Sequence, residues 1–106
     1  NLLNASAHIT GGGLIENLLR SIPKNLSIKI DLGKIKTTGI FKFIKKNKIS
    51  DKEMLRTFNC GVGFCLIIKK NNIKKIQKVF SKKYKPYEIG KVISNKKIKL
   101  INNLRW

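Results

Sequence analysis

Three consecutive glycines, at positions 11 to 13, limit the possible folds of this chain more than any other sequence feature. Without a Cβ atom the backbone there is unrestricted, so the run interrupts any regular element. Residues 5–9, before the glycines, suit the edge of a strand that runs into a turn. After them, the spacing of apolar residues predicts an amphipathic helix from Leu14 to Ile22, which Pro23 ends. The chain therefore passes from strand to helix through a turn of bare backbone.

The rest of the chain mixes strand and helix patterns without a repeating strand–helix–strand unit. Helices are predicted over residues 40–46, 50–58 and 71–83. The second opens with a capping box, in which Ser50 is the N-cap and Glu53 lies three residues later. Strands are predicted over residues 26–30, 63–69, 87–93 and 98–101, and the apolar run at 63–69 is typical of a buried central strand. We therefore expect one α+β domain over residues 1–106, with helices packed on a mixed β-sheet.

The helix predicted over residues 71–83 is basic on one face and apolar on the other. Its apolar stripe is expected to pack on the core, and it consists of Ile73, Ile76, Val79 and Phe80. The lysines opposite are expected to form a solvated face, with a helix lying on a membrane surface as the alternative.

The net charge of the chain is strongly positive. It has 24 Lys and Arg against 5 Asp and Glu, for a formal net charge of +19, which is a feature of nucleic-acid-binding proteins. However, 21 of the 24 are Lys, whereas the forked guanidinium group of Arg is better suited to phosphate and base contacts. Lys, Ile and Asn make up 49 of the 106 residues and share A/T-rich codons, so coding bias explains much of the charge. A small basic nucleic-acid-binding protein remains the alternative interpretation.

The remaining composition excludes several classes of protein. Two cysteines, Cys60 and Cys65, are too few for a disulfide scaffold, so we expect core or turn thiols in a reduced, cytoplasmic protein. One histidine and scattered carboxylates predict no metal site. No apolar run approaches the roughly 18 residues of a membrane span, and no secretory signal is recognisable. Because the chain starts at Asn1 and enters an apolar stretch directly, we expect a fragment or an excised domain.

The glycine run is the first candidate for a binding site. A helix that begins just after it presents free N–H groups and a positive dipole end, which suit a phosphate or another anion. A flexible turn without a ligand is the alternative. His8 either binds an anion or moves a proton there, or is a structural residue. Glu16 and Asn17 fall in the first helical turn, where Glu16 either complements the dipole or contacts a substrate.

A second glycine-bearing turn follows the helix predicted over residues 50–58. Arg56 can bind a phosphate or carboxylate through two N–H groups, and Asn59 can both donate and accept hydrogen bonds. Alternatively this segment is an ordinary helix C-terminus, with Gly61 as its cap.

Two motifs together resemble one enzyme family. Residues 7–18 are similar to the start of the C-terminal domain of the phosphoribosylformylglycinamidine cyclo-ligases, also called aminoimidazole ribonucleotide synthetases, of purine biosynthesis. Residues 49–63 resemble the second signature of that family, and residues 89–92 also fit. Because the order and spacing of the motifs agree, the resemblance extends over about residues 5–93.

This resemblance implies a two-domain subunit that dimerises through its N-terminal domain. The family converts formylglycinamidine ribonucleotide and ATP, with Mg²⁺, into aminoimidazole ribonucleotide, ADP and phosphate in the cleft between the two domains. Most ATP and metal ligands belong to the N-terminal domain, which this chain lacks, so we expect the chain alone to be inactive. By resemblance His8 is a catalytic or orienting residue. The residues implied in phosphate or substrate binding are Thr10, Gly11, Gly12, Gly13, Glu16, Asn17, Arg56, Asn59 and Gly61.

Overall fold

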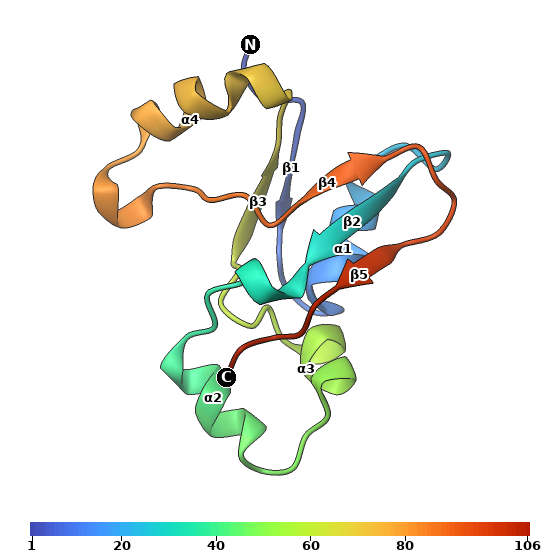
Figure 1. Ribbon diagram of the computed structural model, residues 1–106, viewed down its shortest axis with the longest axis vertical. Helices are drawn as coiled ribbons and strands as arrows, with labels where there is room; N and C mark the ends of the chain where they lie inside the picture. Colours follow the sequence, from blue (N-terminus) through green and yellow to red (C-terminus); the bar gives the residue numbers. More distant parts are fainter.

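Two small β-sheets and four α-helices make up the computed structural model, which describes residues 1–106 (Figure 1). The strands are β1 (Ala5–His8), β2 (Ser27–Asp31), β3 (Phe64–Ile67), β4 (Gly90–Ile93) and β5 (Lys99–Ile101). The helices are α1 (Gly13–Arg20), α2 (Gly39–Lys45), α3 (Asp51–Thr57) and α4 (Ile73–Val79). Helices and strands are interspersed along the chain, and the predicted α+β class is confirmed.

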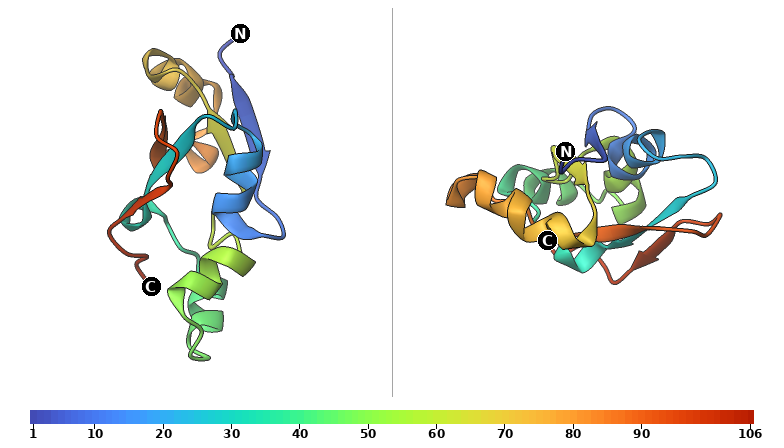
Figure 2. Two further views of the ribbon diagram at one scale, coloured as in Figure 1. Left: turned by 90° about the vertical axis from the view of Figure 1, so that its right-hand side faces the viewer. Right: turned by 90° about the horizontal axis from the view of Figure 1, so that it is seen from above.

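The larger sheet has the order β4-β2-β5 and is mixed. Strand β2 is antiparallel to β4, with Ile28 opposite Val92, and parallel to β5, with Ile30 opposite Leu100. Side chains alternate between the two faces of a strand, so Ile28 and Ile30 share one face. Helix α1 lies against that face, and the opposite face is uncovered (Figure 2).

The smaller sheet contains only β1 and β3, which are antiparallel, with Ala5 opposite Ile67 and His8 opposite Phe64. The expectation of a buried central strand over residues 63–69 is therefore wrong. Strand β3 has one partner, and the Phe64 side chain is 59% exposed. An apolar run predicts a covered strand, but no element of this chain covers the outer side of β3.

The hydrophobic core lies between α1, α3 and the inner face of the larger sheet. It consists of 14 buried residues, which include Leu14 and Leu18 of α1, Ile28 and Ile30 of β2, and Met54 of α3. Burial of each such side chain contributes roughly 1.5–3 kcal/mol relative to exposure. In all, 17 of the 106 residues are buried, so the molecule leaves much apolar surface in contact with solvent.

A local sequence signal accounts for the start of helix α3. The Ser50 hydroxyl accepts a hydrogen bond from the Glu53 backbone N–H (3.2 Å), so Ser50 is the predicted N-cap of α3. The Glu53 carboxylate does not return to Ser50 but accepts a hydrogen bond from the Thr57 hydroxyl (2.8 Å).

None of the helices is long and apolar enough to cross a membrane.

Helix α4 differs from the prediction in length and in packing. It ends at Val79, and a separate 3₁₀ turn covers Lys82–Tyr84, so the helix predicted over residues 71–83 is shorter. None of its residues is buried, and its last apolar positions, Val79 and Phe80, are 74% and 40% exposed. The prediction that its apolar stripe packs on the core is wrong, because α4 projects away from both sheets (Figure 1).

Candidate functional site

The two glycine-bearing turns lie side by side at one end of the smaller sheet. Strand β1 ends at His8 and β3 begins at Phe64, and the two strands are antiparallel, so the turn after β1 and the turn before β3 emerge together. The Ile9 N–H donates a hydrogen bond to the Gly63 carbonyl (2.9 Å), which joins the turns directly. Two turns that are about 50 residues apart in sequence thus form one surface.

The three glycines of the first turn have different roles. Gly12 and Gly13 have φ angles of 95° and 76°, in the left-handed region that favours glycine. A Cβ atom on Gly13 would lie 1.8 Å from the Leu55 carbonyl oxygen, so the bare backbone of Gly13 is what lets α1 approach α3. A Cβ atom on Gly11 would have no neighbour within 4 Å. Only the exposed Gly11 leaves open space that a ligand could enter.

Asn17 holds the first turn from inside the protein. Its side-chain amide donates hydrogen bonds to the carbonyls of Gly13 (2.7 Å), Gly11 (3.2 Å) and Thr10 (3.3 Å), and the residue is buried. The side-chain N–H groups of Asn17, which the sequence suggested for ligand binding, therefore donate to the protein backbone. In this structure Asn17 is a positioning residue for the glycine turn.

Glu16 places a negative charge against the same turn. A Cβ atom on Gly12 would lie 2.3 Å from Glu16 Oε2, and the Glu16 carboxylate is paired with Arg20 on the next helical turn. The carboxylate complements the positive end of the α1 dipole. A phosphate that binds the backbone of the turn would compete with this carboxylate.

The second turn is shaped by Asn59 and Gly61. The Asn59 side-chain oxygen accepts a hydrogen bond from the Gly61 N–H (2.9 Å), which closes a tight turn. Gly61 has a φ angle of 104°, and a Cβ atom there would lie 2.7 Å from the Lys36 carbonyl oxygen. Because α3 ends at Thr57 and Phe58 is its C-cap, the expectation of Gly61 as the cap, which belonged to the alternative of an ordinary helix C-terminus, is wrong.

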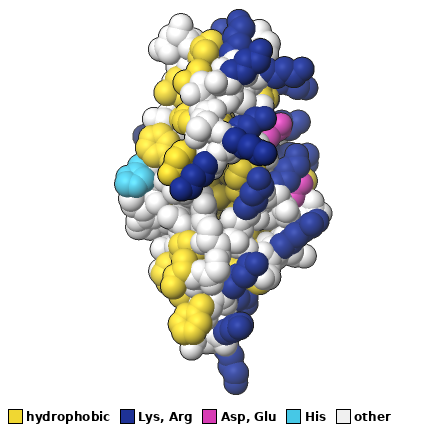
Figure 3. All heavy atoms as spheres, turned by 90° about the vertical axis from the view of Figure 1, so that its left-hand side faces the viewer, with side chains coloured by type: hydrophobic (Ala, Val, Ile, Leu, Met, Phe, Trp, Pro, Cys, Tyr) yellow, Lys and Arg dark blue, Asp and Glu magenta, His cyan; other side chains and the backbone are white.

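The side chains that remain available to a ligand are His8, Thr10 and Arg56. All three are exposed. The His8 ring lies 6.0 Å from the Phe64 ring, centroid to centroid, and Figure 3 shows the histidine at the surface beside apolar side chains. Arg56 is only loosely held, since its guanidinium is 3.6 Å from the Glu53 carboxylate and its side chain is 74% exposed. An imidazole, a hydroxyl and a guanidinium beside exposed backbone suit an anionic ligand.

The residues of this site do not fit a magnesium ion. No three His, Cys, Asp or Glu side chains gather anywhere in the structure. The carboxylates of Glu16 and Glu53 each pair with an arginine, and that of Asp51 pairs with Lys45. Mg²⁺ binds through carboxylates and phosphates in octahedral geometry, and this chain provides no such set.

The sequence did not predict two backbone groups that shape the site, which are the carbonyls of Leu55 and Lys36. Each lies where a side chain at Gly13 or Gly61 would otherwise be. The only sequence signal was the glycines themselves, which indicate a close approach but do not identify the approaching group.

The two cysteines are buried and free, as predicted for core or turn thiols. Burial raises the pKa of the Cys60 thiol to about 11, with the Asp51 carboxylate adding to the effect, and burial alone raises the pKa of Cys65 to about 11. Neither thiol has the lowered pKa of an activated nucleophile.

We expect both thiols to react slowly in the folded protein. At pH 8 a thiol of pKa about 11 has roughly a hundredfold less thiolate than one of pKa about 9. Iodoacetamide should label neither Cys60 nor Cys65 within the time that labels both in 6 M guanidinium chloride. The pKa of each thiol is higher in the folded than in the unfolded chain. The contribution of the two thiols to the free energy of unfolding should therefore be fully present below pH 9 and be lost as the pH rises toward 11. Fast labelling of the folded chain at pH 8 would contradict both statements.

Comparisons with known proteins identify relatives of this chain. The family described as "AIR synthase related protein, C-terminal domain" matches residues 1–103. The phosphoribosylformylglycinamidine cyclo-ligase of Xylella fastidiosa (strain Temecula1) is 38% identical over 94 residues, which are 87% of this chain and 27% of the relative. That of Lactobacillus helveticus is 38% identical over 104 residues, 92% of this chain and 30% of the relative. The bifunctional purine biosynthetic protein purD of Dictyostelium discoideum is 41% identical over 96 residues, 89% of this chain and 12% of the relative.

The chain spans less than a third of the length of each of these relatives. Their names refer to purine biosynthesis and cyclo-ligase activity. They give no support to the alternative of a small basic nucleic-acid-binding protein.

Proposed function

The chain belongs to the AIR synthase related family, whose C-terminal domain it matches over residues 1–103, and from this premise we propose that it is the C-terminal part of a phosphoribosylformylglycinamidine cyclo-ligase. That enzyme closes the imidazole ring of aminoimidazole ribonucleotide at the expense of ATP. The observation that carries the proposal is the match over nearly the whole chain, which includes both glycine-bearing turns. The contact between these turns supports a single site.

We assign separate roles to the exposed and the buried residues of the site. Thr10 and the backbone of Gly11 receive a phosphate of the ribonucleotide substrate or of ATP. Arg56 contacts the same ligand from α3, and His8 orients the substrate or takes the proton that the ring nitrogen loses at closure. Asn17, Asn59 and Gly61 keep the two turns in shape, as their hydrogen bonds and close contacts indicate.

The apolar surface of the chain supports a partner domain. Large apolar side chains that are exposed here include Ile40, Phe43, Phe64, Val79 and Tyr84. Apolar side chains gather along one edge of the face seen in Figure 3, where the histidine also lies, while lysines and arginines follow the other edge. Extended apolar patches mark interaction surfaces. We propose that the N-terminal domain of the cyclo-ligase covers this side and completes the cleft.

ATP and Mg²⁺ belong to the proposed enzyme as a whole. Because no set of carboxylates here fits Mg²⁺, we place the metal ligands on the N-terminal domain. We also propose that the intact enzyme is a dimer formed through that domain, as the family resemblance implies. Two free thiols agree with a reducing compartment such as the cytoplasm.

A chimeric enzyme tests this function. Residues 5–103 would replace the matching segment of the Xylella cyclo-ligase, and ATP-dependent formation of aminoimidazole ribonucleotide would be measured. We expect the chimera to be active and the 106-residue chain alone to be inactive. His8→Ala in the chimera should lower kcat at least tenfold, because a positioned proton-transfer group contributes about a hundredfold or more. Arg56→Ala should mainly raise KM.

The matched control is Lys75→Ala, which removes an exposed cation on α4 outside the two turns. It should leave kcat and KM within twofold of the chimera. If the chimera is folded, with an unchanged melting temperature, and has no activity, the proposed function is wrong. If His8→Ala has wild-type kinetics, only the role of His8 fails.

A further inference from the structure

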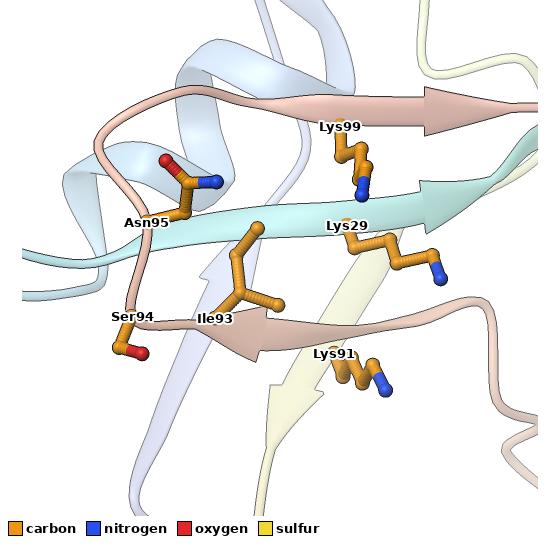
Figure 4. Close-up of a pocket in the computed structure, with 6 residues that line it drawn as sticks. All are labelled: Lys29, Lys91, Ile93, Ser94, Asn95 and Lys99. Atoms are coloured by element: carbon orange, nitrogen blue, oxygen red, sulfur yellow. The ribbon is translucent and has the colours of Figure 1, made fainter.

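A row of three lysines crosses the uncovered face of the larger sheet. In the register of this sheet Lys29 of β2 lies opposite Lys91 of β4 and opposite Lys99 of β5. Figure 4 shows the three side chains leaving their strands on the same side and extending in the same direction, with α1 behind the sheet. Neighbouring strands are about 4.8 Å apart, so the row spans roughly 10 Å.

The lysine row, Lys29, Lys91 and Lys99, has no acidic partner. The ion pairs of the molecule are Arg20–Glu16, Lys45–Asp51 and Arg56–Glu53, and none of them includes a member of the row. Like charges directly opposite each other on neighbouring strands are destabilising. The three lysines in line therefore repel one another, and a bound anion would relieve this repulsion.

The acidic groups beside the row, Asp31 and Glu88, form no ion pair with it. Asp31 and Glu88 line an adjoining hollow together with Lys29 and Lys91. The Asp31 carboxylate, however, accepts hydrogen bonds from the Asn102 side chain (2.9 Å) and the Gly33 N–H (2.9 Å). These bonds, led by that of Asn102, hold the pKa of Asp31 below its ordinary value, so this charge is already stabilised elsewhere.

The row borders a hollow of the right size and chemistry for a small anion. The hollow has a volume of about 400 Å³ and is lined by Lys29, Lys91, Ile93, Ser94, Asn95 and Lys99. Volumes of about 300–1,000 Å³ are typical of small-molecule sites. Ser94 and Asn95, at the start of the β4–β5 connection, add neutral hydrogen-bond donors at the other end of the hollow, away from the three ammonium groups (Figure 4).

One more polar group at this end of β2 lacks a partner. Ser27 lies two residues before Lys29, on the same side of the strand, and opposite Ile93. Its hydroxyl is buried and makes no hydrogen bond. Buried hydroxyls are nearly always paired, but Ser27 does not line the hollow, so the proposal rests on the lysine row and not on this hydroxyl.

We propose that the uncovered face of the β4-β2-β5 sheet binds an oligophosphate chain along the lysine row, at a site separate from the glycine turns. Lysine binds phosphate as a point charge, and three of them in line present positive charge along the length of one oligophosphate chain. A single carboxylate or phosphate would meet only part of the row. The site lies on the opposite face of the sheet from α1, so it is independent of the proposed cyclo-ligase function.

Calorimetric titration with sodium tripolyphosphate at 150 mM salt tests this site. We expect one tripolyphosphate to bind each chain, and Lys29→Gln and Lys99→Gln each to weaken binding at least tenfold. Lys75→Gln is the matched control, because it removes the same charge from the exposed side of α4, and it should change affinity less than twofold. Lys99 is exposed, so its variant is informative even if Lys29→Gln folds poorly. Equal losses in the three variants would overturn the proposal, since they would show binding to the net charge alone.

Titrations with other phosphates identify the ligand, and NMR shifts identify the place of binding. ATP that binds as tightly as tripolyphosphate supports recognition of the phosphate chain alone, whereas tighter binding of ATP adds a contact to the nucleoside. Monophosphate should bind at least tenfold more weakly than either. Amide NMR shifts induced by tripolyphosphate should map to β2, β4 and β5. Shifts confined to Thr10–Gly13 would overturn this site and leave the proposed role of the glycine turn intact.

Discussion

Replacing Gly13 with alanine is expected to lower the free energy of unfolding by about 3 kcal/mol or more. The new Cβ atom would lie 1.8 Å from the Leu55 carbonyl oxygen, and the φ angle of 76° is unfavourable for alanine. Backbone strain of this kind costs about 1–3 kcal/mol, and forcing atoms into a packed contact costs a similar amount again. Because α1 and α3 contribute much of the core, the helices would have to separate.

Gly11→Ala is the matched control for that substitution. It lies in the same glycine run, but a Cβ atom there would have no neighbour within 4 Å. Its effect should stay within about 1 kcal/mol in either direction. Urea unfolding followed by circular dichroism and by the fluorescence of Trp106 measures both variants. If the two unfolding midpoints coincide, the close approach of Gly13 to Leu55 does not exist in solution.

Features set by neighbouring residues were predictable from the sequence. Ser50 caps α3 because its hydroxyl reaches an N–H three residues on, within a single turn of helix. The alternation of Ile28 and Ile30 with polar residues likewise placed β2 with one face in the core. The two glycine-bearing turns were recognised because three glycines in a row, or a glycine two residues after Asn59, interrupt regular helices and strands and favour turns.

Features that depend on distant residues were not predictable. The apolar residues of β3 and α4 were expected in the core, but Phe64 and Val79 are among the most exposed large apolar side chains. Their pattern is that of residues that meet a partner surface, and hydrophobicity alone does not say whether the partner belongs to this chain. The register that brings Lys29 beside Lys91 and Lys99 is likewise set by strand pairing across more than 60 residues.

The second large effect is expected for Asn17. Asn17→Leu keeps the size of the side chain but leaves the carbonyls of Gly13, Gly11 and Thr10 without their shared donor. Of the three hydrogen bonds only the one to Gly13 is buried, and an unsatisfied buried polar group costs about 1–3 kcal/mol, so we expect a loss of about that size, measured by urea unfolding. Asn47→Leu is the matched control, since the Asn47 amide also donates to two backbone carbonyls but is exposed to water. It should lose less than about 1 kcal/mol.

Asn17→Asp separates loss of the donor from loss of packing. An ionised carboxylate would face the same three carbonyl oxygens, so folding should raise the pKa of this carboxyl group above that of the unfolded chain. A carboxyl with a raised folded pKa destabilises the protein above that pKa and loses this penalty as protonation restores one donor. The stability deficit of Asn17→Asp relative to wild type should therefore shrink between pH 7 and pH 4, while that of Asn17→Leu stays constant. Parallel pH profiles for the two variants would show that Asn17 merely fills space and that the glycine turn keeps its shape without it.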